Sequence, residues 1–324
     1  MKTIHYLGIS AIAVAFLLLG CDGCGGVKGI GDDYTKSRQK ALACTFTSEK
    51  CPYLFTPGPR GGIRAILGSS LPEDFMGLEH TSDGTVLRLP NYERTQYYVL
   101  AMGQEPRIID TPPGAFLNSD NQVALRCEDR GRGDVVFSDG LQMRLPEFEL
   151  DDDGQYLCVG GTYYDYSTET RGSMPITIRS MHAPEKVLAT SSMTGILSKP
   201  FCFPDRLYVF ARQYPEGNGT GWMACEVYRR QGSELVFTES MKIESPLWLS
   251  SWVLVKDVCP DQEHILLYAK RDLPLPSHRY LFDMKTRKTW DLGSASTESF
   301  VGFLDRHVFD ELLEQPASGP SQPE

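Results

Sequence analysis

The sequence predicts an all-β fold made of repeated four-stranded units. Short runs rich in β-branched and aromatic residues alternate with turn residues, and almost no segment shows the period of a helix. An aspartate-centred turn recurs between two apolar runs, at intervals that bracket the roughly 40–45 residues of one propeller blade. These turns are Asp83-Gly84, Asp120-Asn121, Asp153-Gly154, Pro204-Asp205 and Pro260-Asp261. We therefore expect a single β-propeller.

The unit nearest the C-terminus shows the pattern most clearly. Its expected strands are Trp252–Cys259, His264–Ala269, Arg279–Met284 and Thr289–Leu292, with a turn at 260–263. Four strands bounded by turn residues form one blade. Degenerate units of the same kind are expected near 75–111, 114–146, 147–192, 197–243 and 247–293.

Both ends of the repeat region hold further strand-like segments. They are Gly62–Leu67, Phe300–Leu304 and His307–Leu312. A blade shared by the two ends removes free sheet edges, so we expect about six four-stranded blades. Five or seven blades stay open as alternatives, and so does a pair of β-sandwich domains.

The last unit also carries three short motifs. Cys259-Pro260-Asp261 precedes the apolar strand His264–Tyr268, Leu281–Asp283 is followed by Met284-Lys285-Thr286, and Trp290-Asp291 comes next. Together they resemble the blades of bacterial WD-repeat-like propellers, which have Ser-Pro-Asp-Gly, Asp before Lys-Thr-Gly, and a Trp-Asp dipeptide at these places. Here Cys replaces Ser, and Gln and Arg replace the two glycines. The resemblance implies a fold and says little about activity.

The N-terminus carries a lone cation, Lys2, and then an apolar run of 14 residues that ends in Leu18-Leu19-Gly20-Cys21. At 1.5 Å per residue this run is too short to span a hydrocarbon core of about 30 Å, and it suits a secretory signal. The motif resembles the lipobox of bacterial lipoproteins, which implies that Cys21 is lipidated and becomes the mature N-terminus. Acyl chains, palmitate among them, would then hold the protein on a membrane of the cell envelope, facing the periplasm. By the same resemblance, Asp22 favours the inner membrane.

The expected organisation has four segments: a signal peptide at 1–20, a flexible tether at 21–50, the propeller at 51–313 and a disordered tail at 314–324. Glycines among polar residues mark the tether, and Pro, Ser and Gly mark the tail.

The net charge limits the expected partners, and the cysteines indicate where a disulfide is expected. The formal net charge of −10 disfavours nucleic acid and anionic headgroups, so the lipid anchor is the expected membrane attachment. Among nine cysteines, Cys44 and Cys51 are the best candidates for a disulfide. The buried-hydrophobe interpretation is favoured for Cys127, Cys158, Cys202 and Cys225. No zinc-like spacing is present, and no metal or cofactor is expected.

The alignment of the units places the longer loops, between second and third strands, on one face. They are 128–133, 163–174, 213–221 and 270–278. Aromatic and basic residues crowd them, and such residues anchor interfaces and stack on sugars. The possible binding face comprises Tyr163, Tyr164, Asp165, Tyr166, Arg171, Tyr214, Trp222, Arg271 and His278.

Catalytic templates are absent from the sequence. It has no G-x-S-x-G, H-E-x-x-H, P-loop or G-x-G-x-x-G pattern, and Asp151–Gly154 fits a turn better than a calcium loop. The sequence therefore favours a non-catalytic envelope lipoprotein that binds a protein or a glycan. The alternative is a carbohydrate-active hydrolase or lyase with carboxylates in the propeller funnel, because such acids would come from different blades.

Overall fold

The computed structural model describes most of the repeat region and a few residues beside it. The described residues are 46–47, 52–55, 79–101, 104, 107–128, 131–165, 170–213, 221–244, 250–259, 262–271, 277–295 and 301–303. Within them no helix is long and apolar enough to cross a membrane. Cys21, Cys44, Cys51, Tyr166 and Tyr214 lie outside the described residues.

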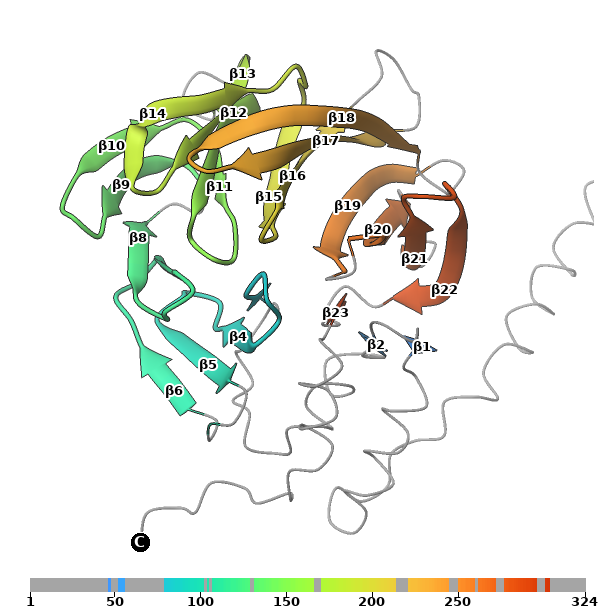
Figure 1. The fold of residues 1–324 in the computed structure, drawn as a ribbon, viewed down its shortest axis with the longest axis horizontal. Helices are drawn as coiled ribbons and strands as arrows, with labels where there is room; N and C mark the ends of the chain where they lie inside the picture. Colours follow the sequence, from blue (N-terminus) through green and yellow to red (C-terminus); the bar gives the residue numbers. More distant parts are fainter. Residues whose placement is uncertain are drawn as a thin grey trace, which may run out of the picture.

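The described chain forms five four-stranded antiparallel sheets, arranged round a common centre (Figure 1). Blade 1 contains β3 (Glu79–His80), β4 (Val86–Pro90), β5 (Gln96–Ala101) and β6 (Arg107–Asp110). Blade 2 contains β7 (Ala115–Leu117), β8 (Val123–Cys127), β9 (Gly133–Phe137) and β10 (Gln142–Leu145). Blade 3 contains β11 (Phe148–Leu150), β12 (Tyr156–Asp165), β13 (Thr170–Ser180) and β14 (Ala183–Thr190). Blade 4 contains β15 (Ile196–Cys202), β16 (Arg206–Gln213), β17 (Trp222–Gln231) and β18 (Glu234–Glu244). Blade 5 contains β19 (Ser250–Val258), β20 (His264–Arg271), β21 (Ser277–Asp283) and β22 (Thr289–Ala295).

In every blade the strands pair in sequence order, so the fold is a single all-β propeller with four-stranded blades. The expected units coincide with the blades to within a few residues at their ends. The first strands face the centre, since β15 contacts both β11 and β19, and β19 contacts β23 (Val301–Phe303).

Both ends of the chain contribute to a further sheet, the terminal sheet. In it β2 (Pro52–Phe55) pairs with β1 (Phe46–Thr47) on one side and with β23 on the other. In the antiparallel pair of β2 and β23, Tyr53 lies opposite Phe303 and Phe55 lies opposite Val301. β1 precedes residue 51, where the propeller was expected to begin. The expected strands at 62–67 and 307–312 lie outside the described residues, and the count of six blades stays a prediction because the terminal sheet has three described strands.

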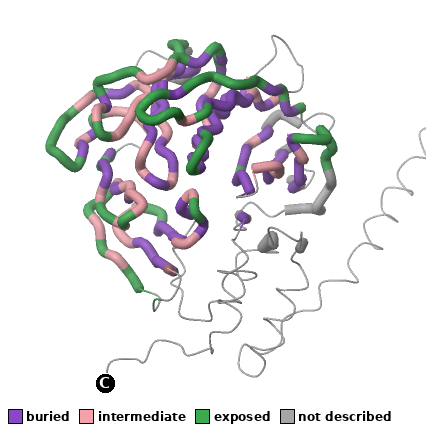
Figure 2. Tube along the Cα trace, in the orientation of Figure 1, coloured by how far each residue is buried: buried purple, intermediate pink, exposed green. Residues whose placement is uncertain are grey.

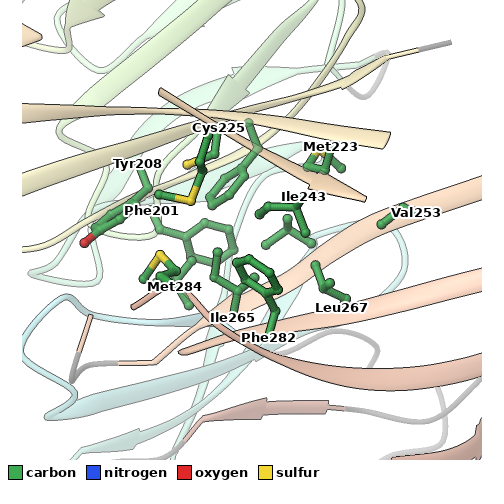
Figure 3. Close-up of a cluster of buried hydrophobic side chains, with 14 of the residues drawn as sticks. Phe201, Tyr208, Met223, Cys225, Ile243, Val253, Ile265, Leu267, Phe282 and Met284 are labelled. Atoms are coloured by element: carbon green, nitrogen blue, oxygen red, sulfur yellow. The ribbon is translucent and has the colours of Figure 1, made fainter. Parts of the chain in front are cut away.

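Burial falls from the middle of each blade to its outer edge (Figure 2). In β16 six consecutive residues are buried, because both faces of this strand are covered by neighbouring blades. In β18, an outermost strand, most residues are exposed. Between blades 4 and 5, Phe201 and Met223 belong to one buried cluster with Ile265 and Phe282 (Figure 3). Apolar packing of this kind joins one blade to the next.

The described cysteines are all buried: Cys127, Cys158, Cys202, Cys225 and Cys259. Four of them were expected to act as small buried hydrophobes, and their burial agrees with that interpretation.

Glycines allow the backbones of blades 3 and 4 to touch. The carbonyl oxygen of Gly195 accepts a hydrogen bond from the Thr162 N–H at 2.6 Å. Gly195 has a φ of +100°, and a Cβ there would lie 2.3 Å from the backbone oxygen of Arg212. Only glycine fits this position without moving β16 of the same blade, and across the interface a Cβ at Gly161 of blade 3 would lie 2.6 Å from the Gly195 oxygen.

We therefore expect Gly195→Ala to destabilise the propeller, because it adds a backbone clash to the strain of a positive φ. Gly232→Ala is the matched control: Gly232 has a φ of +63° with open space around it, so only strain of about 1 kcal/mol is added. Urea unfolding should show that Gly195→Ala lowers the free energy of unfolding by about 2 kcal/mol or more beyond the decrease in the control. Equal losses would contradict the close approach.

Candidate functional site

The first strands of four blades bring charged side chains together near the centre. This group, the axial cluster, also includes residues of β4 and of two turns. Its members are Glu79, His80, Arg88, Arg94, Glu149, Asp152, Lys199, Lys256 and Asp257. A charge inside an otherwise apolar strand is costly unless it is paired or solvated. Each member is therefore expected to have a partner of opposite charge or contact with solvent.

Asp257 joins three parts of the ring. Its Oδ1 lies 2.8 Å from His80 Nε2, and its Oδ2 accepts a hydrogen bond from the Phe303 N–H at 2.6 Å. Blade 1, blade 5 and the terminal sheet therefore meet at one carboxylate. Asp257 and His80 are both nearly inaccessible to solvent, at 3% and 5% exposure, so this contact is shielded from competing water.

His80 is held as an imidazolium. Nε2 faces the Asp257 carboxylate and Nδ1 faces the Thr81 carbonyl oxygen at 3.1 Å, and both partners are acceptors. Each ring nitrogen therefore serves as a donor. Burial by itself lowers the pKa of His80, but the carboxylates of Asp257 and Asp152 outweigh it and raise the pKa to about 9.

A second contact links blades 3 and 4. Lys199 Nζ lies 2.5 Å from Asp152 Oδ2, which also accepts the His80 backbone N–H at 3.2 Å. Asp152 belongs to the turn between β11 and β12, so three blades share this carboxylate. Arg88, which is fully buried, donates to the backbone oxygens of Asn118 and Asp152.

Glu79 is neutralised within blade 1. Arg94 Nη2 lies 2.7 Å from Glu79 Oε1, and Arg88 Nε lies 3.7 Å from Oε2. Burial raises the pKa of Glu79, but the two guanidinium groups outweigh it, so the pKa lies below its ordinary value.

Glu149 and Lys256 differ from the other members, because neither has an ion-pair partner among the described residues. Glu149 is half-buried, and its burial, followed by the charge of Glu147, raises its pKa to about 7. Lys256 is exposed, with its Nζ 5.2 Å from the centre of the Tyr268 ring. The surrounding blades and the charges of Arg279 and Lys199 lower the pKa of Lys256.

A small recess adjoins the cluster where the first strands end. It holds about 210 Å³ of empty space, part of it open to solvent, and is lined by His80, Ser82, Asp152, Asp153, Phe201, Cys202 and Phe203. The part of this space that is open to a water molecule would hold about one water, so the recess is too small for an oligomeric substrate.

Asp151, Asp153 and Cys202 place ligand atoms within 4.8 Å of one another, near enough to share a metal ion. Their contacts favour another role. The carboxylate of Asp151 accepts the backbone N–H groups of Asp153, Gln155 and Tyr156, and Asp153 accepts that of Ser82. Arg230 Nη1 lies 3.7 Å from the Cys202 sulfur, where it would repel a cation. The aspartates therefore build the turn that the sequence predicted.

Several residues of the expected binding face lie at the second-to-third-strand connections. Tyr164 and Arg171 are paired across β12 and β13, with Tyr163 beside them, while Arg271 ends β20. The side chains of these four are outside the described part. Trp222 begins β17 and is half-buried, 4.8 Å from Lys242 Nζ, and His278 in β21 stacks on Tyr280. That these residues form one binding surface stays a prediction.

The axial cluster itself was missed in the sequence. The available signal was a charged residue inside an otherwise apolar first strand, as in Ser-Lys-Pro at 198–200 and Val-Lys-Asp-Val at 255–258. To recognise this signal, one must know which strand of each blade faces the centre.

No protein-family model matches the chain, and no curated protein matches it. Among solved structures it is similar to an oligogalacturonate lyase in complex with manganese, at 14% identity, TM-score 0.37, covering 69% of this chain and 67% of that one. It is also similar to a functionally unknown protein from Desulfotomaculum acetoxidans DSM 771, at 11% identity, TM-score 0.42, covering 81% and 98%. TolB from Acinetobacter baumannii matches at 12% identity, TM-score 0.36, covering 72% and 57%. At such TM-scores these likenesses carry no argument about function, and the propeller follows from the sheet order of the chain itself.

The ionised His80 makes a pH-dependent contribution to stability. Because its pKa is raised from 6.5 to about 9, this contribution is complete below pH 6.5 and is lost as the pH rises through 9. We expect the free energy of unfolding to fall across pH 7–9.5, by at most about 3 kcal/mol from this group.

Urea unfolding at several pH values checks this prediction. His80→Gln should flatten the dependence of the unfolding free energy on pH. His182→Gln, at an exposed turn, should leave that dependence unchanged. Should His80→Gln fail to fold, the ring protons of His80 in the wild type still report its titration by NMR. A midpoint near 6.5 would contradict the imidazolium assignment.

Proposed function

We propose that this protein is a non-catalytic binding module of the bacterial cell envelope, anchored to a membrane by lipid, which presents one face of its propeller to a protein or a glycan. The observation that carries the proposal is a hairpin that projects from blade 3. β12 and β13 contain 10 and 11 residues, whereas β11 contains three.

The projecting part is the pairing of 163–165 with 170–172, because Thr162 is still hydrogen-bonded to Gly195 of blade 4. β11 pairs only with Leu157–Val159, and β14 pairs only with 177–180, so no strand of the described sheet flanks the outer half of the hairpin. A two-stranded ribbon of this kind gains little stability by itself. Its length is better explained by contact with another molecule, since binding residues concentrate on loops held by a rigid scaffold.

The composition of the hairpin suits recognition. Tyr163, Tyr164 and Arg171 lie in the projecting part, and Met174 is exposed at its base. Tyrosine and arginine are enriched among residues that contribute most to binding. Trp222 and His278 begin the third strands of blades 4 and 5 at the equivalent connections, which supports a shared face.

The charged centre supports a structural role more than a catalytic one. Glu79, Asp152 and Asp257 converge there, but each is neutralised by a cation that holds blades or strands together. The second candidate, a carbohydrate-active hydrolase or lyase, is favoured by Glu149, whose pKa of about 7 suits proton transfer.

The membrane attachment is proposed from the N-terminal motif. Cys21 would carry the acyl chains, Asp22 would favour the inner membrane, and the glycine-rich segment after them would let the propeller stand off the surface. Confinement to a surface raises the effective concentration of the module toward a membrane-bound partner.

Replacing residues 163–174 with a Gly/Ser segment should abolish capture of the partner in a crosslinked pull-down, because it removes the projecting hairpin. The control is the double variant Asp139→Ser and Leu141→Ser, in the exposed β9–β10 turn, which opens to the opposite face. It should capture the partner as well as the wild type does. Equal recovery with the 163–174 variant would end the assignment of this face.

Cys21→Ala should release the protein from membranes or block removal of the signal, because the thiol that accepts the lipid is gone. Cys24→Ala, three residues further on, should leave both unchanged. Membrane fractionation with an assay of signal removal tests this. Unchanged fractionation and processing in Cys21→Ala would exclude the anchor.

A further inference from the structure

The connection between blades 3 and 4, residues 191–195, is hydrogen-bonded to both blades. We call this segment the interblade strap; it joins β14 to β15. On the side of blade 3, the Ser191 N–H donates to the Ile176 carbonyl oxygen at 2.8 Å, and the Gly195 carbonyl oxygen accepts the Thr162 N–H at 2.6 Å. Thr162 is the last residue of β12 before the projecting part of the hairpin, so the strap is attached to the base of that hairpin.

On the side of blade 4, the strap is held by the carboxylate of Glu226 in β17. Its Oε1 accepts both the backbone N–H of Ser192, at 3.1 Å, and the Ser192 hydroxyl, at 2.5 Å. Its Oε2 accepts the hydroxyl of Tyr228 at 2.5 Å. Hydrogen bonds to an ionised acceptor are stronger than those between neutral groups, so Glu226 fixes the middle of the strap to blade 4.

Glu226 places a negative charge in an apolar interface. It is 1% exposed, and its neighbours on the same face of β17, Ala224 and Tyr228, pack in the cluster that joins blades 3 and 4. Its hydrogen-bond donors are two hydroxyls and one backbone N–H, and no cation pairs with it within the described ranges. An apolar residue of similar size would fill this space without the cost of desolvating a charge. The carboxylate is therefore best explained by the strap that it holds.

The strap carries the constraint from Glu226 to the hairpin over a short distance. Two residues separate Ser192 from Gly195, and the first of them, Met193, is buried in the same interface cluster. With Ser192 fixed and Met193 packed, little freedom is left to the Gly195 carbonyl oxygen. The position of this oxygen sets that of the Thr162 N–H, where the projecting part of the hairpin begins.

The strap also contacts blade 4 at the connection between its second and third strands. The side-chain amide of Gln213 donates to the Thr194 carbonyl oxygen. Gln213 ends β16 and pairs with Trp222, which begins β17. The projecting hairpin and Trp222 are thus attached to one segment, on either side of it.

We propose that Glu226 is a positioning residue for the projecting hairpin. By fixing the strap, its carboxylate holds Thr162 in place, so that the hairpin and the Trp222 end of blade 4 are presented to a partner in one fixed arrangement. The use of this arrangement in recognition rests on the function proposed above, whereas the placement of the hairpin by Glu226 does not.

Amide hydrogen exchange on the full-length protein tests the placement. Glu226→Met keeps the length of the side chain but has no carboxylate to accept from Ser192. It should raise the exchange rate of the Thr162 amide by about tenfold or more, because the Gly195 oxygen is freed. Leu157, in the middle of the same strand, reports opening of blade 3 as a whole and should change much less. Glu226→Gln should restore slow exchange at Thr162, because its amide oxygen can replace Oε1.

Thr238→Val is the matched control. The Thr238 hydroxyl donates to the Val227 carbonyl oxygen in β17 at 2.8 Å, so this variant removes a hydrogen bond beside Glu226 without touching the strap. It should leave exchange at Thr162 unchanged. If Glu226→Met does not fold, Ser192→Ala removes the hydroxyl contact alone and should raise exchange at Thr162 to a smaller extent. Unchanged exchange at Thr162, or an equal increase at Leu157, would overturn the proposal.

A crosslinked pull-down then tests the use of this placement. Glu226→Met should capture less partner than the wild type, and Glu226→Gln should restore capture. If replacement of residues 163–174 lowers capture but Glu226→Met does not, the positioning role is refuted. If that replacement has no effect, the function proposed above fails, and exchange at Thr162 still decides whether Glu226 places the hairpin.

Discussion

The Asp257 carboxylate is the constraint on which the rest of the ring depends. A propeller closes only where its first and last sheets are held together. Asp257 does this by accepting from His80 of blade 1 and from the backbone of Phe303 in the terminal sheet. The contact is charge-assisted on one side and shielded from water.

Apolar packing and charged contacts have different roles in this fold. Between blades 4 and 5, aromatic and aliphatic side chains fill the interface, and such packing tolerates small displacements. Near the centre, the contacts of Asp152 and Asp257 require fixed distances. Buried ion pairs add little net stability compared with apolar residues of similar shape. Their contribution here is to select one register for the blades.

The strands could be predicted from the sequence because their signals are local. Asp-centred turns such as Asp153-Gly154 set the hairpins, and the side chain of Asp151 accepts three backbone N–H groups within that turn. The axial cluster could not be predicted in this way, because Arg88 reaches turns of two other blades and His80 pairs with a residue of blade 5. Residues 163–174 were expected to form a loop, whereas Tyr163 and Tyr164 belong to β12 and Arg171 belongs to β13.

The terminal sheet has a consequence for the order in which the protein folds. Within each blade, strands adjacent in sequence pair through short connections, so these hairpins form at low entropic cost. The pairing of Tyr53 with Phe303 instead joins segments separated by nearly the whole described chain. Closing so long a loop is the most costly single step in chain entropy, and non-local strand pairing is slow. We therefore expect the blades to assemble first as an open arc, with β2 and β23 meeting last. Until they meet, the arc keeps two unpaired sheet edges, and this is the interval in which the folding chain is most exposed to aggregation.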